Sequence, residues 1–173
     1  MSHNPYPIPT RFLDATAKAA ASLVKGPIAT FLTTWAGASG AALLGRTGAG
    51  KSLCVAQACA RVCKRENSTT WIKWIRADEL AHLLTGRQGW DAIELLKLAR
   101  ILVIDDMGYE RWHETLLEVI GHRYDHNRPT VITTGMTQSA FADRYGDATL
   151  RRIAETGNGL IVDCWPKKVA AAR

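Results

Sequence analysis

The sequence lacks long hydrophobic runs and contains few cysteines. None of its apolar stretches approaches the roughly 18 residues of a membrane-spanning helix, and the opening MSHNPYPIPTRF has no apolar core of the signal-peptide kind. Its 4 cysteines form no C-x-x-C pair, and three of them (Cys54, Cys59 and Cys63) share one expected helix, which is not a usual metal-ligand pattern. We therefore expect a soluble cytoplasmic protein with reduced, buried cysteines and no membrane partner.

Internal repeats, low-complexity tracts and interdomain linkers are also absent from the sequence. A chain of 173 residues with 47% apolar content suffices for one full core. Residues 1–10 carry three prolines and are expected to form an extended lead-in, so we assign one domain to residues 11–173. The formal charge of +6 favours an anionic partner, for which nucleic acid is a candidate.

Expected strands alternate with expected helices along the chain. A helical stretch over 11–35 is interrupted by Gly26-Pro27, and a polar loop is expected at Gly86–Gly89. Asp78 and Asp91 are placed to cap the helices that follow them. This alternation predicts a three-layer α/β fold with a central, mainly parallel sheet. The expected strands are 41–44, 69–75, 101–104, 130–133 and 160–164, and the later helices are 51–63, 79–84, 92–99, 113–125 and two pieces within 139–155.

A glycine-rich turn with the full pattern G-x-x-x-x-G-K-S lies between an expected strand and an expected helix. Glycines let successive backbone N–H groups converge on phosphate oxygens at a helix N-terminus, whose dipole favours an anion. Lys51 supplies a positive charge for the β and γ phosphates, and the Ser52 hydroxyl is a ligand for Mg²⁺. The predicted cofactors are ATP and Mg²⁺, and the predicted ATP-binding residues are Gly45, Arg46, Thr47, Gly48, Ala49, Gly50, Lys51 and Ser52.

Two acids follow the apolar run Ile101–Ile104. An open α/β sheet binds its ligands at the carboxyl ends of such strands. We therefore expect Asp105 to polarise a Mg²⁺-bound water or to contact the metal through that water, and Asp106 to orient the attacking water as a catalytic base. Helix capping or a loop position is the alternative for both acids.

The segments IPTRF, AALLGRTGAGKS, LARILVIDDMG, NRPTVITTGMT and LRRIAETGNGLIVDCW carry a family resemblance over roughly residues 8–168. In this order and spacing the chain resembles the AAA+ ATPase domain of DnaC-type helicase loaders, and it shares much with the related IstB-type transposition helpers. The resemblance implies a P-loop NTPase fold of AAA+ type. It also implies an ATPase that self-associates through its ATP sites and acts on DNA with a partner protein.

Two further site residues follow from the resemblance. The family places a γ-phosphate-sensing Asn after the Thr that ends the fourth strand, but Gly135 occupies that position here, so Thr134 is the candidate substitute and hydrolysis is expected to be slow. The family also places an arginine in a late helix against the ATP of the neighbouring subunit, and Arg152 matches it. The implied role of Arg152 is an arginine finger that acts in trans.

The expected function is therefore an ATPase that loads a replicative helicase onto DNA, with single-stranded DNA as a further partner. A transposition helper whose partner is a transposase is one alternative. Another alternative is a small P-loop kinase, although no arginine-rich lid is evident in the sequence. A nucleotide-dependent switch with little hydrolysis remains open because of Gly135. The resembling loaders usually carry an extra N-terminal region for the helicase, and about ten residues precede the resemblance here.

Overall fold

A five-stranded sheet forms the centre of the molecule in a computed structural model that describes residues 5–14, 26–83 and 87–165. The strand order is β2-β3-β4-β1-β5, and every pair of neighbouring strands is parallel. This arrangement confirms the predicted α/β class. The strands are β1 (Ala41–Leu44), β2 (Ile72–Arg76), β3 (Ile101–Met107), β4 (Thr130–Thr134) and β5 (Leu160–Asp163).

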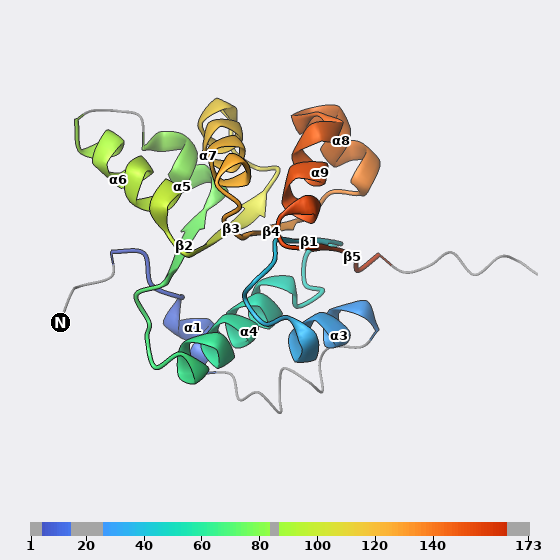
Figure 1. Ribbon diagram of the computed structural model, residues 1–173. Coiled ribbons are helices and arrows are strands. Elements are labelled where there is room, and N and C mark those ends of the chain that lie inside the picture. The colour runs from blue at the N-terminus through green and yellow to red at the C-terminus, as the bar shows by residue number, and fades with distance from the viewer. Residues whose placement is uncertain (1–4, 15–25, 84–86, 166–173) are drawn as a thin grey trace, which may run out of the picture.

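Helices cover both faces of the sheet, which gives three layers (Figure 1). The lower layer contains α1 (Thr10–Leu13), α3 (Pro27–Thr34) and α4 (Lys51–Arg65), and the upper layer contains the remaining helices. β1, β3 and β4 are buried along their whole length apart from the half-buried Asp106, as expected for parallel strands covered on both faces. The upper helices are α5 (Ala77–His82), α6 (Arg87–Leu98), α7 (Glu114–Asp125), α8 (Gln138–Tyr145) and α9 (Asp147–Glu155).

Alternation along the strands divides the core into two clusters. Leu43, Val103 and Val131 pack on the α4 side, together with the buried cysteines of that helix. Leu44 and Ile132 face the upper layer. Successive side chains of a strand point to opposite faces, so the parity of a residue decides which helical layer it meets.

Several predicted element boundaries are wrong. β2 starts at Ile72 instead of residue 69, and α5 starts at Ala77 instead of residue 79. Asp78 is not a cap: it lies in the first turn of α5, where its carboxylate accepts a hydrogen bond of 3.0 Å from Arg76. β3 continues through both acids to Met107 instead of ending at Ile104.

The predicted loop at residues 86–89 and the cap at Asp91 are also wrong. α6 begins at Arg87, so Gly89 and Asp91 lie inside the helix. Ile93 and Leu96 of this helix are fully buried against the upper core. Burial of this face stabilises the helix despite the low helix propensity of Gly89.

The first described residues run along the outer edge of the sheet. The Trp74 N–H on β2 donates to the Tyr6 carbonyl over 3.0 Å, so this segment covers the open edge of β2. α3 falls within the predicted helical stretch, and α1 begins one residue before it, at Thr10. Residues 15–25 of the stretch lie outside the described part of the chain. Within the described residues, no helix combines the length and the apolar character needed to cross a membrane.

Candidate nucleotide-binding site

The glycine-rich turn Gly45–Ser52 connects the carboxyl end of β1 to the start of α4. Gly48 and Gly50 have φ values of 81° and 82°, which L side chains rarely adopt. At Gly45 an added Cβ would lie 2.7 Å from Cβ of Cys164, so the loop is packed closely against the end of β5. These positions explain why the pattern requires glycine, and they place the loop as the sequence predicts.

Lys51 is folded back into its own loop. Its ammonium group donates to the carbonyl of Gly45 over 2.6 Å and to that of Arg46 over 3.0 Å, and the residue is only 6% exposed. Burial lowers the pKa of Lys51, while the charges of Cys164, Asp106 and Asp105 act in the opposite direction. The loop thus surrounds a positive charge whose hydrogen-bond partners are carbonyls of the loop itself.

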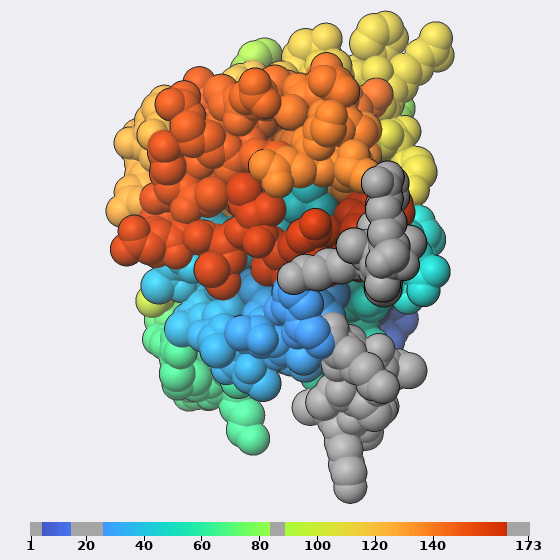
Figure 2. Space-filling view, turned by 90° about the vertical axis from the view of Figure 1, so that its right-hand side faces the viewer, coloured from blue at the N-terminus to red at the C-terminus, as the bar shows by residue number. Residues whose placement is uncertain are grey.

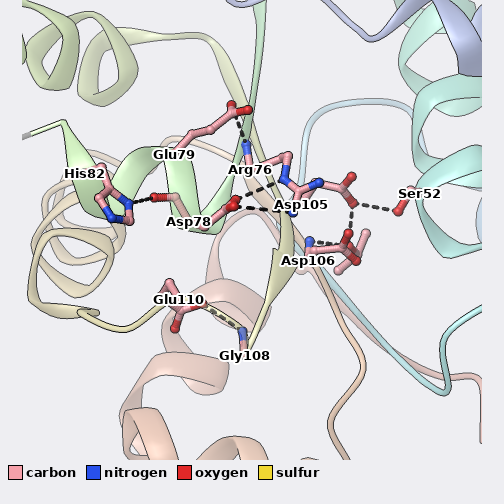
Figure 3. Close-up of polar contacts among 10 residues, drawn as sticks. Ser52, Arg76, Asp78, Glu79, His82, Asp105, Asp106, Gly108 and Glu110 are labelled. Atoms are coloured by element: carbon pink, nitrogen blue, oxygen red, sulfur yellow. Dashed lines mark hydrogen bonds and ion pairs between the residues drawn. The ribbon is translucent and has the colours of Figure 1, made fainter.

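Asp105 is the centre of a buried polar cluster (Figure 3). Its Oδ1 accepts a hydrogen bond of 2.7 Å from the Ser52 hydroxyl and one of 2.6 Å from the Thr133 hydroxyl. Burial raises the pKa of Asp105, these two hydrogen bonds lower it, and the charge of Asp106 raises it again. A carboxylate held against the Ser52 hydroxyl is an oxygen pair suited to Mg²⁺.

Asp106 adopts a left-handed backbone conformation, with φ of 59°, beside a register shift between Ile104 and Met107. Its N–H donates to the Thr133 hydroxyl over 3.0 Å. Such a bulge redirects a side chain at a strand end, and non-glycine residues with positive φ often mark functional sites. The charge of Asp106 raises the pKa of Asp105. It also acts to raise the pKa of Lys51, against the larger lowering effect of burial. The structure therefore brings both predicted acids next to the loop.

Thr133 was not singled out in the sequence, although it contacts both acids. Strand parity groups Thr133 with Val131 on β4 and Asp105 with Val103 on β3, but the contact also requires β3 and β4 to be neighbours, which the parity does not contain. Thr134 points to the other face. Its buried hydroxyl donates to the Met107 carbonyl over 2.6 Å and accepts from the Met136 N–H. This geometry argues against the predicted role of Thr134 at the nucleotide.

Arg152 lies near the amino end of β1, whereas the glycine-rich loop follows the carboxyl end of that strand. The carbonyl oxygen of the next residue, Ile153, lies only 2.1 Å from the position that a Cβ added to Gly40 would take. Gly40 directly precedes β1. The loop follows the other end of β1. Arg152 Nη1 lies beside Gly121 of α7, 3.7 Å from the position of an added Cβ. Arg152 is therefore not part of the site formed by its own chain.

Glu110 supports the segment after β3. It is buried, and it accepts hydrogen bonds from the Gly108 N–H, over 2.9 Å, and from the hydroxyl of Tyr145 on α8. Arg144 forms an ion pair with it at 3.3 Å. Nothing in the sequence pattern marked Glu110, because its partners come from a helix 34 and 35 residues further along the chain.

The residues present fit a nucleotide phosphate and a divalent cation. A cationic side chain is enclosed by a glycine loop at a helix N-terminus, and a hydroxyl–carboxylate pair adjoins it. Among the described residues, no group of three or more histidine, cysteine or acidic side chains suggests a different metal centre. Fold and site together define a P-loop NTPase domain.

Comparisons with known proteins agree with this class. A family model described as IstB-like ATP binding protein matches residues 29–154, and the chain belongs to this family. A search of curated protein sequences found no significant match. The fold is that of AAA+ P-loop domains, as the similar solved structures show.

Three of these structures illustrate the likeness. The DnaC helicase loader has a TM-score of 0.67 at 19% identity, covering 89% of this chain and 99% of that chain. DnaI has a TM-score of 0.63 at 18% identity, covering 90% of this chain and 93% of that chain. AMPPCP-bound DnaA from Aquifex aeolicus has a TM-score of 0.58 at 17% identity, covering 79% of this chain and 44% of that chain.

Proposed function

We propose that this chain is a Mg²⁺-dependent ATPase that loads a replicative helicase onto DNA. The observation that carries the ATPase part of the proposal is the Ser52–Asp105 hydrogen bond next to a complete phosphate loop, and the likeness to the DnaC helicase loader supports the loading role. Lys51 would leave its loop carbonyls to bind the β and γ phosphates, while Ser52 and Asp105 would hold Mg²⁺. Bound Mg²⁺ would neutralise charge on the phosphate oxygens.

Asp106 would orient the attacking water, because its charge lies near Lys51 and its backbone is held by Thr133. Arg152 would complete the ATP site of a neighbouring subunit, since it lies away from its own loop. Self-association through the ATP sites is therefore part of the proposal. The helicase and single-stranded DNA are the proposed partners. They are supported by the net charge of +6 and by two similar structures, the DnaC helicase loader and a replication initiator DnaA bound to AMPPCP and single-stranded DNA.

A transposition helper that acts with a transposase is the second candidate, favoured by the name of the matching family model. It shares the ATP chemistry and differs in the partner protein. A binding assay with a replicative helicase and with a transposase, each in the presence of ATP, separates the two candidates.

The direct test is ATP turnover by the full chain with and without single-stranded DNA. The proposal is supported if the chain releases phosphate from ATP and if single-stranded DNA changes the rate of this release. Phosphoryl transfer to a small acceptor would indicate a kinase, and nucleotide binding without turnover would indicate a switch. A logarithm of the DNA-binding constant that falls linearly with the logarithm of salt concentration would show that phosphate contacts carry the association.

A further inference from the structure

Gly135 leaves a gap at the carboxyl edge of the sheet, beside the phosphate loop. It follows Thr134, the last residue of β4, whose carbonyl accepts the N–H of Gly45 over 3.2 Å. A residue at position 135 thus adjoins the first glycine of the loop. Glycine offers no side chain there for a hydrogen bond to a phosphate.

The hydroxyl of Tyr109 occupies this gap. A Cβ added to Gly135 would lie 2.9 Å from the Tyr109 hydroxyl oxygen and 3.9 Å from Oγ1 of Thr47. The backbone φ of Gly135 is not in the left-handed region, so it is the contact with Tyr109 that a side chain would disturb. Gly135 and Tyr109 are therefore complementary: one supplies the space and the other fills it with a polar atom.

The Tyr109 hydroxyl also faces the phosphate loop. It lies 3.4 Å from Oγ1 of Thr47, the third residue of the loop, with which it forms a long hydrogen bond. Tyr109 comes three residues after Asp106 and is 68% exposed. Its hydroxyl is thus bordered by the phosphate loop, by the end of β4 and by the segment that carries both acids.

The backbone around Tyr109 is fixed, although its side chain is exposed. The N–H of Gly108 is held by the buried Glu110, which Tyr145 and Arg144 bind in turn. In Figure 2 the yellow segment after β3 projects from the surface at the upper right. An exposed side chain on an anchored backbone can turn toward a ligand at low cost in ordering.

We infer that Tyr109 makes this chain distinguish ATP from ADP: its hydroxyl donates a hydrogen bond to the terminal phosphate of ATP from the space beside Gly135. The inference rests on the proposed ATP binding at the phosphate loop. Lys51 binds the β and γ phosphates, and the Tyr109 hydroxyl approaches from the side of Thr47. ADP lacks the terminal phosphate, so the hydroxyl gains no partner when ADP binds.

The test measures the affinity of the full chain for ADP and for a non-hydrolysable ATP analogue, both with Mg²⁺, by calorimetry. Tyr109→Phe keeps the ring and removes the hydroxyl, and it should weaken analogue binding about 10-fold or more while leaving ADP binding unchanged. Trp112→Phe is the matched control, because Trp112 is an exposed aromatic residue of the same segment, and it should keep the parental ratio of the two affinities.

A double-mutant cycle makes the test specific to the pair. Gly135→Ala should reduce the preference for the ATP analogue, because its Cβ displaces the hydroxyl. Adding Gly135→Ala to Tyr109→Phe should then cause little further loss. Additive losses from the two changes would overturn the inference.

Three other outcomes also overturn it. If Tyr109→Phe binds both ligands as tightly as the parent, the hydroxyl does not contact the terminal phosphate. If Tyr109→Phe loses both ligands equally, Tyr109 supports the loop without sensing the nucleotide. If the parent binds neither ligand, the proposed function itself fails, so the two failures are distinguishable.

Discussion

The Ser52 hydroxyl donates a hydrogen bond of 2.7 Å to Oδ1 of Asp105. This contact joins the first turn of α4 to β3, over a separation of 53 residues in the sequence. Because the hydroxyl proton points to the carboxylate, the lone pairs of the serine oxygen remain available to a cation. The contact therefore prepares both oxygens for a metal and also stabilises the fold.

Lys51→Ala should weaken ATP binding roughly 100-fold or more, because it removes the ammonium group proposed to bind the phosphates, and a charged hydrogen bond contributes about 1.5–3 kcal/mol. The fold should persist, since the lysine bonds only carbonyls of its own loop. ATP titration and circular dichroism check both expectations. Lys64→Ala, at an exposed position of the same helix, is the control and should bind ATP like the parent.

Asp105→Asn should stabilise the nucleotide-free protein and weaken Mg²⁺-dependent ATP binding about 10-fold or more. Burial raises the pKa of Asp105, against the hydrogen bonds from Thr133 and Ser52. A raised folded-state pKa favours folding when the group is protonated, and this contribution is lost as the pH rises through that pKa. Asparagine keeps an oxygen for both donors and carries no charge.

The gain in Tm from Asp105→Asn should therefore be largest near neutral pH and should shrink as the pH falls toward the ordinary aspartate value of 3.8. Thermal unfolding of both proteins across this range measures the difference. A Tm difference that does not change with pH would mean that ionised Asp105 does not strain the folded state.

Thr133→Val and Thr134→Val should have different effects on the site. Each change removes a buried hydroxyl with two hydrogen bonds, so each should destabilise the protein by about 1–3 kcal/mol. Only Thr133→Val should weaken Mg²⁺-dependent binding, because only Thr133 contacts Asp105. Denaturant unfolding and ATP titration with and without Mg²⁺ separate the two effects. Equal losses of binding would restore Thr134 as a site residue.

Arg123→Met should destabilise the protein by about 3 kcal/mol or more, because several buried acceptors lose their donor at about 1–3 kcal/mol each. The Arg123 guanidinium is fully buried and donates to Thr130 and to four backbone carbonyls, three of them at the end of α6 and just after it. Methionine is similar in length but leaves these acceptors unsatisfied. Arg111→Met, at an exposed position, should change stability by no more than about 0.5 kcal/mol in the same denaturant experiment.

Arg152→Ala should bind ATP normally and lose turnover, because Arg152 lies away from its own phosphate loop. A trans-acting arginine can raise the rate about 10³–10⁵-fold in GTPases, which sets the upper range of the expected loss. Mixing Arg152→Ala with Lys51→Ala should restore part of the turnover, since some interfaces then pair an intact loop with an intact arginine. A co-assembled mixture without turnover would refute the trans role.

The phosphate loop and Asp105 could be predicted from the sequence because each depends on local order: a strand, a fixed glycine spacing, and an acid after an apolar run. Thr133 and Tyr109 could not be assigned in the same way. The role of Thr133 depends on which strands are neighbours, and that of Tyr109 depends on the space that Gly135 leaves for its hydroxyl. Neither feature is encoded in a short pattern. The start of α6 was missed because burial of Ile93 and Leu96 outweighs the propensity of Gly89.

The contact between Gly45 and Cys164 joins two parts of the chain that the ribosome makes at different times. The Cys164 N–H donates to the carbonyl of Leu44, and its Cβ lies against Gly45, so the end of β5 braces the start of the phosphate loop. The loop is translated early, whereas its brace is translated more than a hundred residues later. A nascent chain therefore cannot form this bracing contact until Cys164 has left the exit tunnel, so the start of the phosphate loop gains its support only late in synthesis.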